Sequence, residues 1–478
     1  MDTLDKYQRK RILKDPLAAL QALNANTDPA TIGKLETLHK RYVELSGKYG
    51  EHERRKGILS RNIGDAKKKG HPLNDLKEAM REESKHYSSV RGALSEVRNQ
   101  ILDYFQTNPA NSQLKEEVNA ENLEERWTSP EQATGNIKIS ILNTGEHGEW
   151  NSYIESNPAA SVYHRAEWCS LIRQSFGHES YYFLARNNNR HIVGILPLVR
   201  LKSRLFGDFL VSMPFFNYGG AVGDTPDIEQ QLIDTANTTA LEIGASHVEY
   251  RDDIARHGLH VRNDKVNMIL GLPDTAGALW SGFGSKLRAQ INRPQREHPV
   301  ITIAGEKLVA DFYQVFSRNM RDLGTPVYSK QFFANIMAQF PERSRIIVVS
   351  LSGNPVASGF LISHGRKLEI PWASTISGAN HLSVNMLLYW EALKYAVEKG
   401  HSHFDFGRSS RNSGTYRFKQ QWGAMPKQSY WHYWLNQRDE MPAINPGNPK
   451  YRLAINLWKR LPLAIANRLG PRIVKNIP

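Results

Sequence analysis

The chain has 478 residues, of which 40% are hydrophobic and 23% are charged, a composition that supports several folded domains and excludes a disordered polymer. No run approaches the roughly 18 apolar residues of a membrane-spanning helix, and the polar first residues predict no secretory signal. The only cysteine, Cys169, can form neither an intramolecular disulfide nor a thiolate zinc site. We therefore expect a cytoplasmic protein without a transmembrane segment, a metal or a cofactor.

The net charge is strongly positive. The chain has 62 Lys and Arg residues against 48 Asp and Glu residues, which gives a formal charge of +14. Such an excess favours a polyanionic partner, namely a nucleic acid, a phosphorylated substrate or an anionic membrane surface. Net charge alone does not choose among these partners, so the position of the charge has to decide.

Residues 1–108 have the pattern of long helices. Apolar residues recur every three or four positions between Thr31 and Lys69 and again from Leu73 to Leu102. The break Gly70-His71-Pro72 separates the two runs and is typical of a tight turn. The pattern predicts an antiparallel helical hairpin, or coiled coil.

The predicted tip of this hairpin is basic, with one acid, Asp65, among its charged residues. Its basic residues are Arg54, Arg55, Lys56, Arg61, Lys67, Lys68 and Lys69. A solvated helix surface is one interpretation. Binding to the phosphates of a nucleic acid is the other, and charge concentrated at the end of a long hairpin favours it.

The same block resembles the N-terminal arm of bacterial seryl-tRNA synthetases. The resemblance rests on Arg11–Pro16, Leu20–Leu23, Leu35–Arg41 and Ile58–Gly70, which keep the order and spacing of the arm. In that family the arm binds the long variable arm and elbow of serine tRNA, so the seven basic residues are expected to bind tRNA. The catalytic domain of a synthetase does not follow, so no adenylation by ATP is expected.

A polar, acidic segment at residues 109–136 is predicted to be a linker, and two similar α/β halves follow at 137–275 and 276–437. Gly244–Tyr250 parallels Gly400–Phe406 at a constant offset of 156. The elements predicted in the first half are strands Tyr181–Arg186, Ile192–Val199 and Val248–Tyr250 and a helix at about 228–243. Those predicted in the second half are strands Ile346–Leu351, Val356–Ile362, Leu368–Ala373 and Phe404–Phe406 and the helix Val384–Lys399.

The two halves resemble the FemAB family, whose members have two tandem GNAT-like lobes. The motifs that carry this resemblance are Phe404–Arg408 and Gly414–Gly423. The subgroup associated with exopolysaccharide and PEP-CTERM loci is similar at Pro214–Gly220, Asn319–Pro326 and Pro371–Ser374. The resemblance implies an α/β (α+β) fold. Classical members transfer an aminoacyl group from aminoacyl-tRNA to an amine of a cell-wall precursor, whereas the motifs of the subgroup do not reveal its donor and acceptor.

Two residues are candidates for catalysis. Transfer of an acyl group from an ester to an amine passes through a tetrahedral oxyanion, which a cation can stabilise. Lys419 occupies the position at which the family has such a lysine, and a surface lysine is the alternative interpretation. Asp405, which matches Glu249 in the first half, could accept the proton of the amine, although an acid that orders the nearby backbone is the more common case.

Several further residues are expected to bind substrate. Arg288, Arg293 and Arg296 have the spacing of a basic helix face, for which phosphate binding and solvation are both open. Arg408 is expected at the end of a strand, where α/β sheets bind ligands. The other candidates for the substrate cleft are Asn217, Tyr218, Tyr416 and Phe418.

Residues 438–478 form a basic amphipathic tail that would either dock onto the lobes or contact an anionic membrane such as the inner membrane. Together these features predict an aminoacyl-tRNA-dependent acyltransferase that uses seryl-tRNA and an amine acceptor. One alternative is an acyl-CoA-dependent N-acyltransferase of exopolysaccharide or envelope biosynthesis. Another is a tRNA-binding protein without catalytic activity.

Overall fold

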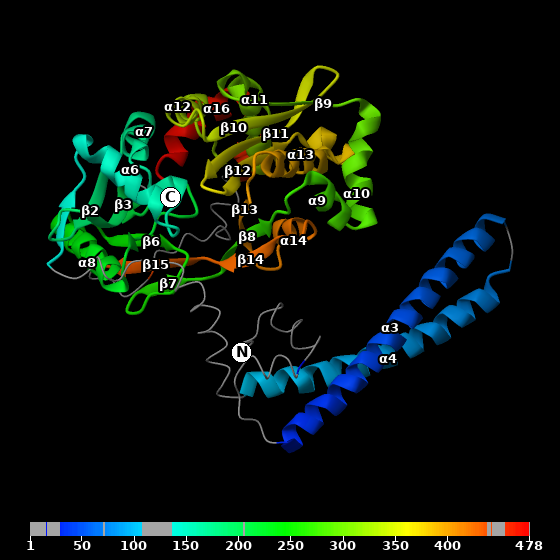
Figure 1. Ribbon diagram of the computed structural model, residues 1–478. Coiled ribbons are helices and arrows are strands. Elements are labelled where there is room, and N and C mark those ends of the chain that lie inside the picture. Colours follow the sequence, from blue (N-terminus) through cyan, green and yellow to red (C-terminus); the bar gives the residue numbers. More distant parts are fainter. Residues whose placement is uncertain are drawn as a thin grey trace. The chain divides into compact units, whose positions relative to one another are not determined.

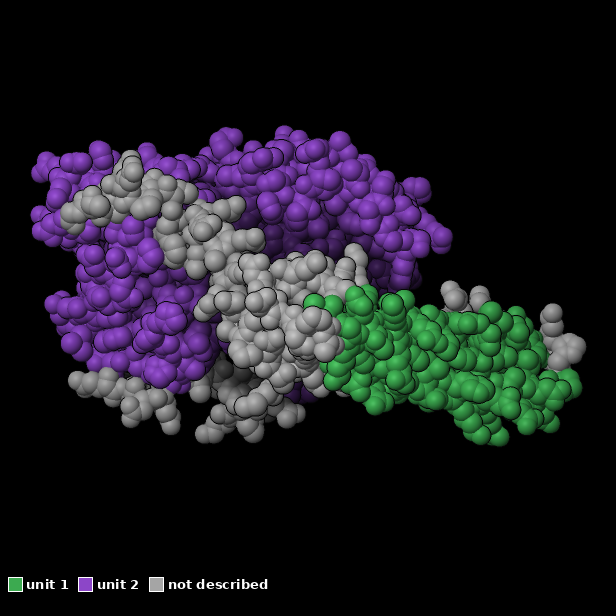
Figure 2. Space-filling model, turned by 60° about the horizontal axis from the view of Figure 1, so that its bottom comes forward, with its two compact units in different colours: residues 1–123 green, residues 124–478 purple. Residues whose placement is uncertain are grey.

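The structure is a computed structural model that describes residues 29–69, 72–107, 136–203, 206–436 and 455–477, together with Pro16 and Met441. The chain divides into two compact units, residues 1–123 and 124–478 (Figure 2). The predicted linker at 109–136 lies outside the described residues except for its last position. The stretches before residue 29 that resemble the synthetase arm also lie outside them, apart from Pro16.

The first unit consists of two long helices, α3 (Pro29–Lys69) and α4 (Asn74–Thr107), that pack against each other (Figure 1). The hydroxyls of Tyr49 and Tyr87 lie 2.5 Å apart, and His52 Nδ1 lies 2.5 Å from Glu83 Oε1. Since the position on α4 decreases as the position on α3 increases, the two helices run antiparallel. Nearer the other end, Leu35, Val97 and Ile101 are buried.

The second unit contains two mixed sheets, as the two tandem lobes predict. The first sheet has the order β1-β2-β3-β4-β6-β15-β7, with β5 paired to β3, and the second has the order β14-β8-β13-β12-β11-β10-β9. The strands of the first sheet are β1 (Lys138–Ile141), β2 (Glu179–Arg186), β3 (Ile192–Ser203), β4 (Gly207–Val211), β5 (Val222–Gly223), β6 (His247–Asp252), β7 (His260–Arg262) and β15 (Tyr430–Leu435). Those of the second are β8 (Lys265–Gly271), β9 (Val300–Ala304), β10 (Ser344–Leu351), β11 (Asn354–His364), β12 (Lys367–Thr375), β13 (His403–Ser410) and β14 (Met425–Gln428).

Helices cover the faces of these sheets. The helices of the second unit are α6 (His147–Ser156), α7 (Glu167–Phe176), α8 (Pro226–Glu242), α9 (Ala276–Gly282), α10 (Ser285–Asn292), α11 (Val309–Leu323), α12 (Lys330–Gln339), α13 (Val384–Glu398), α14 (Gly414–Gln420) and α16 (Leu463–Val474). All elements predicted in the two halves are present within a few residues of their expected bounds. The aligned glycines Gly244 and Gly400 have φ of 70° and 75° and lead into β6 and β13, so the internal repeat has the same backbone geometry in both halves.

The two lobes exchange a strand. After β7 of the first sheet, the chain enters β8 of the second sheet across two residues. After β14 of the second sheet, it returns to β15 of the first sheet across Ser429 alone. A division of the chain at residue 275 therefore leaves β8 and β15 in the sheet of the other lobe. These two crossings tie the sheets together covalently at neighbouring places, because β6 pairs with β15 and β13 pairs with β8.

A hydrophobic core shared by both lobes lies between the sheets. Trp168 of the first lobe contacts Phe340 of the second at 5.0 Å between ring centroids, and Phe216 contacts Trp372 at 5.9 Å. On β10, Ile346 and Val348 belong to this core, whereas the alternate residues face a separate core under α13. The lobes are thus two halves of one folded body rather than independent domains.

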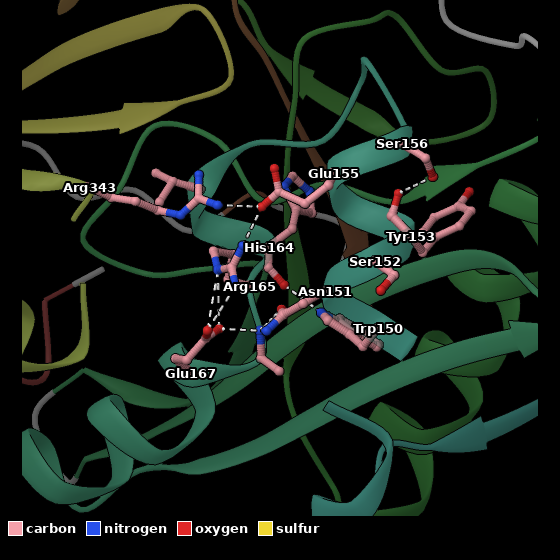
Figure 3. A network of polar contacts seen from close by, with 12 residues as sticks. Trp150, Asn151, Ser152, Tyr153, Glu155, Ser156, His164, Arg165, Glu167 and Arg343 are labelled. Atoms are coloured by element: carbon pink, nitrogen blue, oxygen red, sulfur yellow. Dashed lines mark hydrogen bonds and ion pairs between the residues drawn. The ribbon is translucent and has the colours of Figure 1, made fainter. Parts of the chain in front are cut away.

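A polar network reinforces the contact between the lobes (Figure 3). Glu155 of α6 accepts hydrogen bonds from Arg165 and, at 2.6 Å, from Arg343, which precedes β10. Arg165 also pairs with Glu167 at 2.9 Å. Because Glu155 is exposed, this network contributes less to stability than the buried core does.

The tail docks onto both lobes. Residues Ala466, Gly470 and Val474 form the buried face of α16, which packs against α11. Arg321 donates a hydrogen bond to the carbonyl of Leu461 at 2.8 Å, and His178 Nε2 donates to the carbonyl of Lys475 at 2.6 Å. Among the described helices, none is both long and apolar enough to cross a membrane.

Substitution of Gly220 tests how closely the backbone and side chains of the first lobe pack at this position. A Cβ atom at this position would lie 2.0 Å from Asp252 Oδ1, which belongs to a buried ion-pair network. We expect Gly220→Ala to destabilise the second unit by about 3 kcal/mol or more. All ten tryptophans follow residue 123, so urea unfolding followed by tryptophan fluorescence reports on this unit.

The matched control is Gly148→Ala in α6, where a Cβ atom would meet nothing within 4 Å. It should leave stability unchanged or raise it by up to about 1 kcal/mol. Equal midpoints for the two variants would contradict the close approach at Gly220.

Candidate active site

A loop of the first lobe reaches the central strand of the second. Tyr218, in the loop between β4 and β5, donates a hydrogen bond to Asp405 Oδ2 of β13 at 2.7 Å. The other oxygen of this buried carboxylate accepts from the backbone N–H of Gly407 at 2.8 Å. Lys367 Nζ lies 3.8 Å from Oδ2 and 4.4 Å from the centre of the Tyr218 ring. Both oxygens of Asp405 are therefore occupied, an arrangement suited to ordering the seam between the lobes.

The loop has a strained backbone. Met213 and Phe215 have φ of 56° and 75°, in the left-handed region that bulky residues rarely adopt. Arg251 of β6 holds the loop by donating hydrogen bonds to the carbonyls of Met213, at 3.3 Å, and Phe216, at 2.5 Å. Such residues cost on the order of 1–3 kcal/mol each, and strained backbone occurs most often at functional sites.

Lys419 lies on the second-lobe side of the same seam. It belongs to α14, which begins after Ser413, whose hydroxyl accepts from the N–H of Tyr416. The buried Lys419 ammonium donates to the carbonyls of Gly407 at 2.9 Å and Arg408 at 3.0 Å. Within the described part of the chain, these bonds use two of its three N–H groups, so the third can donate to a substrate oxygen.

Burial, together with the charge of Arg408, lowers the pKa of Lys419 to about 8, although Asp405 and Glu369 oppose the shift. The ammonium therefore loses its proton in the range just above neutral pH. A cation that has to stabilise an oxyanion would be present below this pKa and absent above it.

Glu369 is a site residue that the sequence analysis missed. It pairs in register with Asp405 on the neighbouring parallel strand and is 3% exposed. Burial and the nearby charge of Asp405 together raise its pKa to about 8, although Lys367 acts in the opposite direction. Tyr163 also faces this carboxyl, but within the described part of the chain neither its hydroxyl nor Glu369 Oε1 has a hydrogen bond of good geometry. An acid inside the apolar strand predicted at Leu368–Ala373 is the signal that could have identified it.

Arg408 extends from β13 to the sheet of the first lobe. Its guanidinium carbon lies 3.9 Å from the ring centre of Trp431 on β15, and that of Arg251 lies 4.2 Å from the same ring. Arg251 also donates to Glu249 at 2.8 Å, and Tyr433 donates to the other oxygen of Glu249 at 2.8 Å. Glu249, the counterpart of Asp405, is thus held by side chains of its own lobe.

The other predicted residues have varied surroundings. Asn217 lies near Gly407, beside the seam. Tyr416 is buried in the core under α13, and Phe418 packs against Tyr389 and Trp422, so both contribute to packing. Arg288 is half-buried on α10 and Arg293 is exposed just after it. Within the described part of the chain, no hydrogen bond or ion pair joins these two arginines to Lys419 or Asp405.

Comparison with known proteins identifies the class of the second lobe. Residues 283–420 match the acetyltransferase (GNAT) domain. This part of the chain is a GNAT-type acyltransferase domain. It includes all of β13 and α14, and hence Asp405, Arg408 and Lys419. The sequence matches no curated protein.

Three solved structures are similar to this chain at low sequence identity. The crystal structure of FemX is 13% identical, covers 66% of this chain and all of its own, and has a TM-score of 0.51. L-PGS from Bacillus licheniformis is 14% identical, with a TM-score of 0.42 over 70% of this chain and 99% of its own. A tandem GNAT protein from the clavulanic acid biosynthesis pathway is 11% identical, with a TM-score of 0.41 over 64% of this chain and all of its own. The FemX match shows that the tandem lobes have a FemX-like fold.

The raised pKa of Glu369 predicts a pH-dependent stability. The folded state holds this proton up to about pH 8, whereas the unfolded chain releases it near pH 4.5, so ionisation opposes folding as the pH rises through this window. Glu369→Gln removes the charge, and we expect it to match the parent at pH 5. At pH 9 it should be more stable by on the order of 3 kcal/mol.

The measurement is urea unfolding by tryptophan fluorescence between pH 5 and pH 9. Glu342→Gln is the control, because the Glu342 side chain is 90% exposed and its substitution should not change the pH dependence. A Glu369→Gln variant that is less stable than the parent at pH 9 would show that the buried carboxylate is ionised and paired.

Proposed function

We propose that the protein is an aminoacyl-tRNA-dependent acyltransferase that moves serine from seryl-tRNA to an amine acceptor without ATP. The observation that carries the proposal is the buried ammonium of Lys419, in a GNAT domain at the seam between two FemX-like lobes. Acyl transfer needs positioning and a charge at the oxyanion rather than a covalent intermediate, which suits this arrangement.

In the proposed reaction, the neutral amine attacks the ester carbonyl of the charged tRNA. A C–N bond forms, and the carbonyl oxygen becomes an oxyanion that the third N–H of Lys419 stabilises. The C–O bond to the terminal ribose then breaks, and the ribose hydroxyl takes up the proton that the amine loses. Asp405 acts here as a positioning residue, since Tyr218 and Gly407 occupy both of its oxygens.

The first unit is proposed to bind the tRNA. Its support is the resemblance of residues 1–108 to the arm of seryl-tRNA synthetases and the pairing of α3 with α4. Among the proposed tRNA-binding residues, Arg55 is exposed and pairs with Glu51, while Lys56 lies 4.3 Å from the centre of the Tyr87 ring. The side chains of Arg54, Arg61, Lys67, Lys68 and Lys69 lie outside the described residues.

The GNAT match also favours a second candidate, an acyl-CoA-dependent N-acyltransferase. The two candidates differ in the donor, an ester of tRNA or a thioester of coenzyme A, while the amine and the oxyanion chemistry are the same. A third candidate, a tRNA-binding protein without activity, predicts tRNA binding with no transfer from either donor.

We also propose a cytoplasmic location at the inner membrane. The outward face of α16 carries the exposed apolar residues Ile465 and Leu469 beside the exposed basic residues Arg468 and Arg472. Basic and apolar groups on one helix face suit an anionic lipid surface. Because the inner face of α16 is docked on α11, this contact would not require the helix to detach.

Substitution of Lys419 tests the catalytic proposal. We expect Lys419→Ala to lower kcat for serine transfer by about 10²-fold or more, the usual cost of an oxyanion donor, while tRNA affinity is retained. In the parent, kcat should fall as the pH rises through about 8, because the ammonium is then lost. If Lys419→Ala has the same kcat and the same dependence of kcat on pH as the parent, Lys419 has no role in the mechanism.

Substitutions on the first unit test tRNA binding. Arg54, Arg55 and Lys56 changed together to Ala should weaken binding of serine tRNA by about 10-fold or more at moderate salt. The dependence of log affinity on log salt should become less steep by about 2, because phosphate contacts are lost. The control is a variant in which Lys34, Lys40 and Arg41, which are exposed elsewhere on α3, are changed together to Ala. Equal losses in both variants would indicate a general charge effect instead of a binding tip.

A further inference from the structure

Two arginines contact one tryptophan at the place where the chain crosses between the sheets. Arg251, Arg408 and Trp431, here called the Trp431 cluster, come from β6, β13 and β15. Arg251 and Trp431 are direct neighbours on paired strands, and Trp431 follows the crossing residue Ser429 by two positions. Arg408 is opposite Asn267 of β8, whose side chain donates to the Ser429 hydroxyl at 3.0 Å. The two strand crossings therefore fix the position of the cluster.

Polar groups of the cluster lack partners. The guanidinium of Arg408 makes no hydrogen bond or ion pair with any residue that the structure describes. Within the same part of the chain, the buried Arg251 Nη2 and Trp431 Nε1 also have no hydrogen-bond partner. Arg251 itself is 2% exposed. Buried donors are nearly always satisfied, so unpaired donors at one place point to a missing acceptor.

The other half of the repeat shows what a satisfied site looks like. In the first lobe, Asp252 lies at the end of β6, the strand that corresponds to β13. Asp252 is fully enclosed, since one oxygen accepts from Arg256 at 2.9 Å and the other is bonded to His432 at 2.8 Å. The charged group at the end of β6 is thus enclosed by protein partners, whereas Arg408 near the end of β13 has no hydrogen-bond or ion-pair partner among the described residues.

The nearby acids do not neutralise Arg408. Glu249 is engaged by Arg251 and Tyr433, and Asp264 by Lys265 at 2.9 Å. Burial and the charge of Arg251 together lower the pKa of Arg408 to about 10, although Glu249 and Asp264 oppose the shift. A half-buried, unpaired cation beside a second cation is unfavourable, and an anion placed there would remove this cost.

We infer that Arg408, stacked on Trp431, binds a carboxylate or phosphate group of a substrate. The planar guanidinium can bind two oxygens of either group through parallel hydrogen bonds while its face remains on the indole. The inference rests on the proposed function, because it assigns this group to the acceptor or to the 3′ end of the tRNA. The Lys419 ammonium bonds to the carbonyl of Arg408, so an anion held there would anchor the substrate next to the proposed oxyanion donor.

Anion binding to the full-length protein tests the inference without any transfer reaction. The probes are inorganic phosphate, acetate and a CCA trinucleotide without an esterified amino acid. Each is titrated at an ionic strength that is kept constant with chloride. Thermal unfolding and calorimetry are followed for the parent, Arg408→Gln, Arg408→Lys and the exposed control Arg366→Gln. We expect saturable binding and a rise in Tm for the parent and the control. Arg408→Gln should lose binding, and Arg408→Lys should bind at least about 10-fold more weakly because it lacks the planar fork.

Stability in chloride alone gives a second readout. Because the Arg408 cation has no ion-pair partner among the described residues, Arg408→Gln should have a Tm equal to or higher than that of the parent. A lower Tm together with unchanged phosphate and acetate affinity would overturn the inference. Preference for the trinucleotide over both small anions assigns the group to the tRNA, and preference for acetate or phosphate assigns it to the acceptor. Anion binding lost in Arg408→Gln, without serine transfer by the parent, would keep this inference and contradict the proposed function.

Discussion

The exchange of two strands between the sheets is the constraint on which the site depends. Because β8 and β15 each pair with the central strand of the opposite lobe, β6 and β13 are held next to the crossings. Asp405 and Arg408 lie on β13, Trp431 lies on β15, and Lys419 is bonded to the carbonyls of Gly407 and Arg408 on β13. Glu369 lies on β12, which pairs with β13. A covalent crossing with a shared core holds two lobes more closely than a surface contact, which suits a reaction between two separate substrates.

Several charged groups of the site are held in electrostatically unfavourable surroundings, and the stability of the rest of the fold offsets this cost. Glu369 is buried next to Asp405, Lys419 is buried with a lowered pKa, and Arg408 is a cation without an ion pair among the described residues. The loop that carries Tyr218 has two bulky residues in left-handed conformations. By contrast, the polar groups around Asp252 in the first lobe are paired with one another. The first lobe thus has a closed polar network around Asp252, whereas the polar groups on β13 of the second lobe are open, and the strained loop of the first lobe reaches them through Tyr218. Backbone strain and charged groups in unfavourable surroundings are found most often at functional sites of proteins.

Local patterns were enough to predict most elements of the lobes. Alternating apolar residues located β2, β3, β10 and β11, and the glycines before β6 and β13 marked the internal repeat. The strand exchange was not predictable in the same way, because β8 and β15 look like ordinary strands and their partners are distant in sequence. Motif resemblance pointed to Lys419, Asp405 and Arg408. It did not point to Glu369, Arg251 or Trp431, because the roles of these residues depend on neighbours across the sheets. Such neighbours are distant in sequence: Tyr218 and Asp405, which share a hydrogen bond, are 187 residues apart.

The central claim is that a tRNA ester is the acyl donor, and a direct comparison of donors tests it. The full-length protein would be incubated, without ATP, with labelled seryl-tRNA or with a panel of acyl-CoA thioesters and a mixture of amine acceptors, and products would be identified by mass spectrometry. The account predicts serine amides from seryl-tRNA and no amides from the thioesters. Amides formed from an acyl-CoA, with seryl-tRNA left intact, would contradict it and leave the GNAT lobe with a different donor.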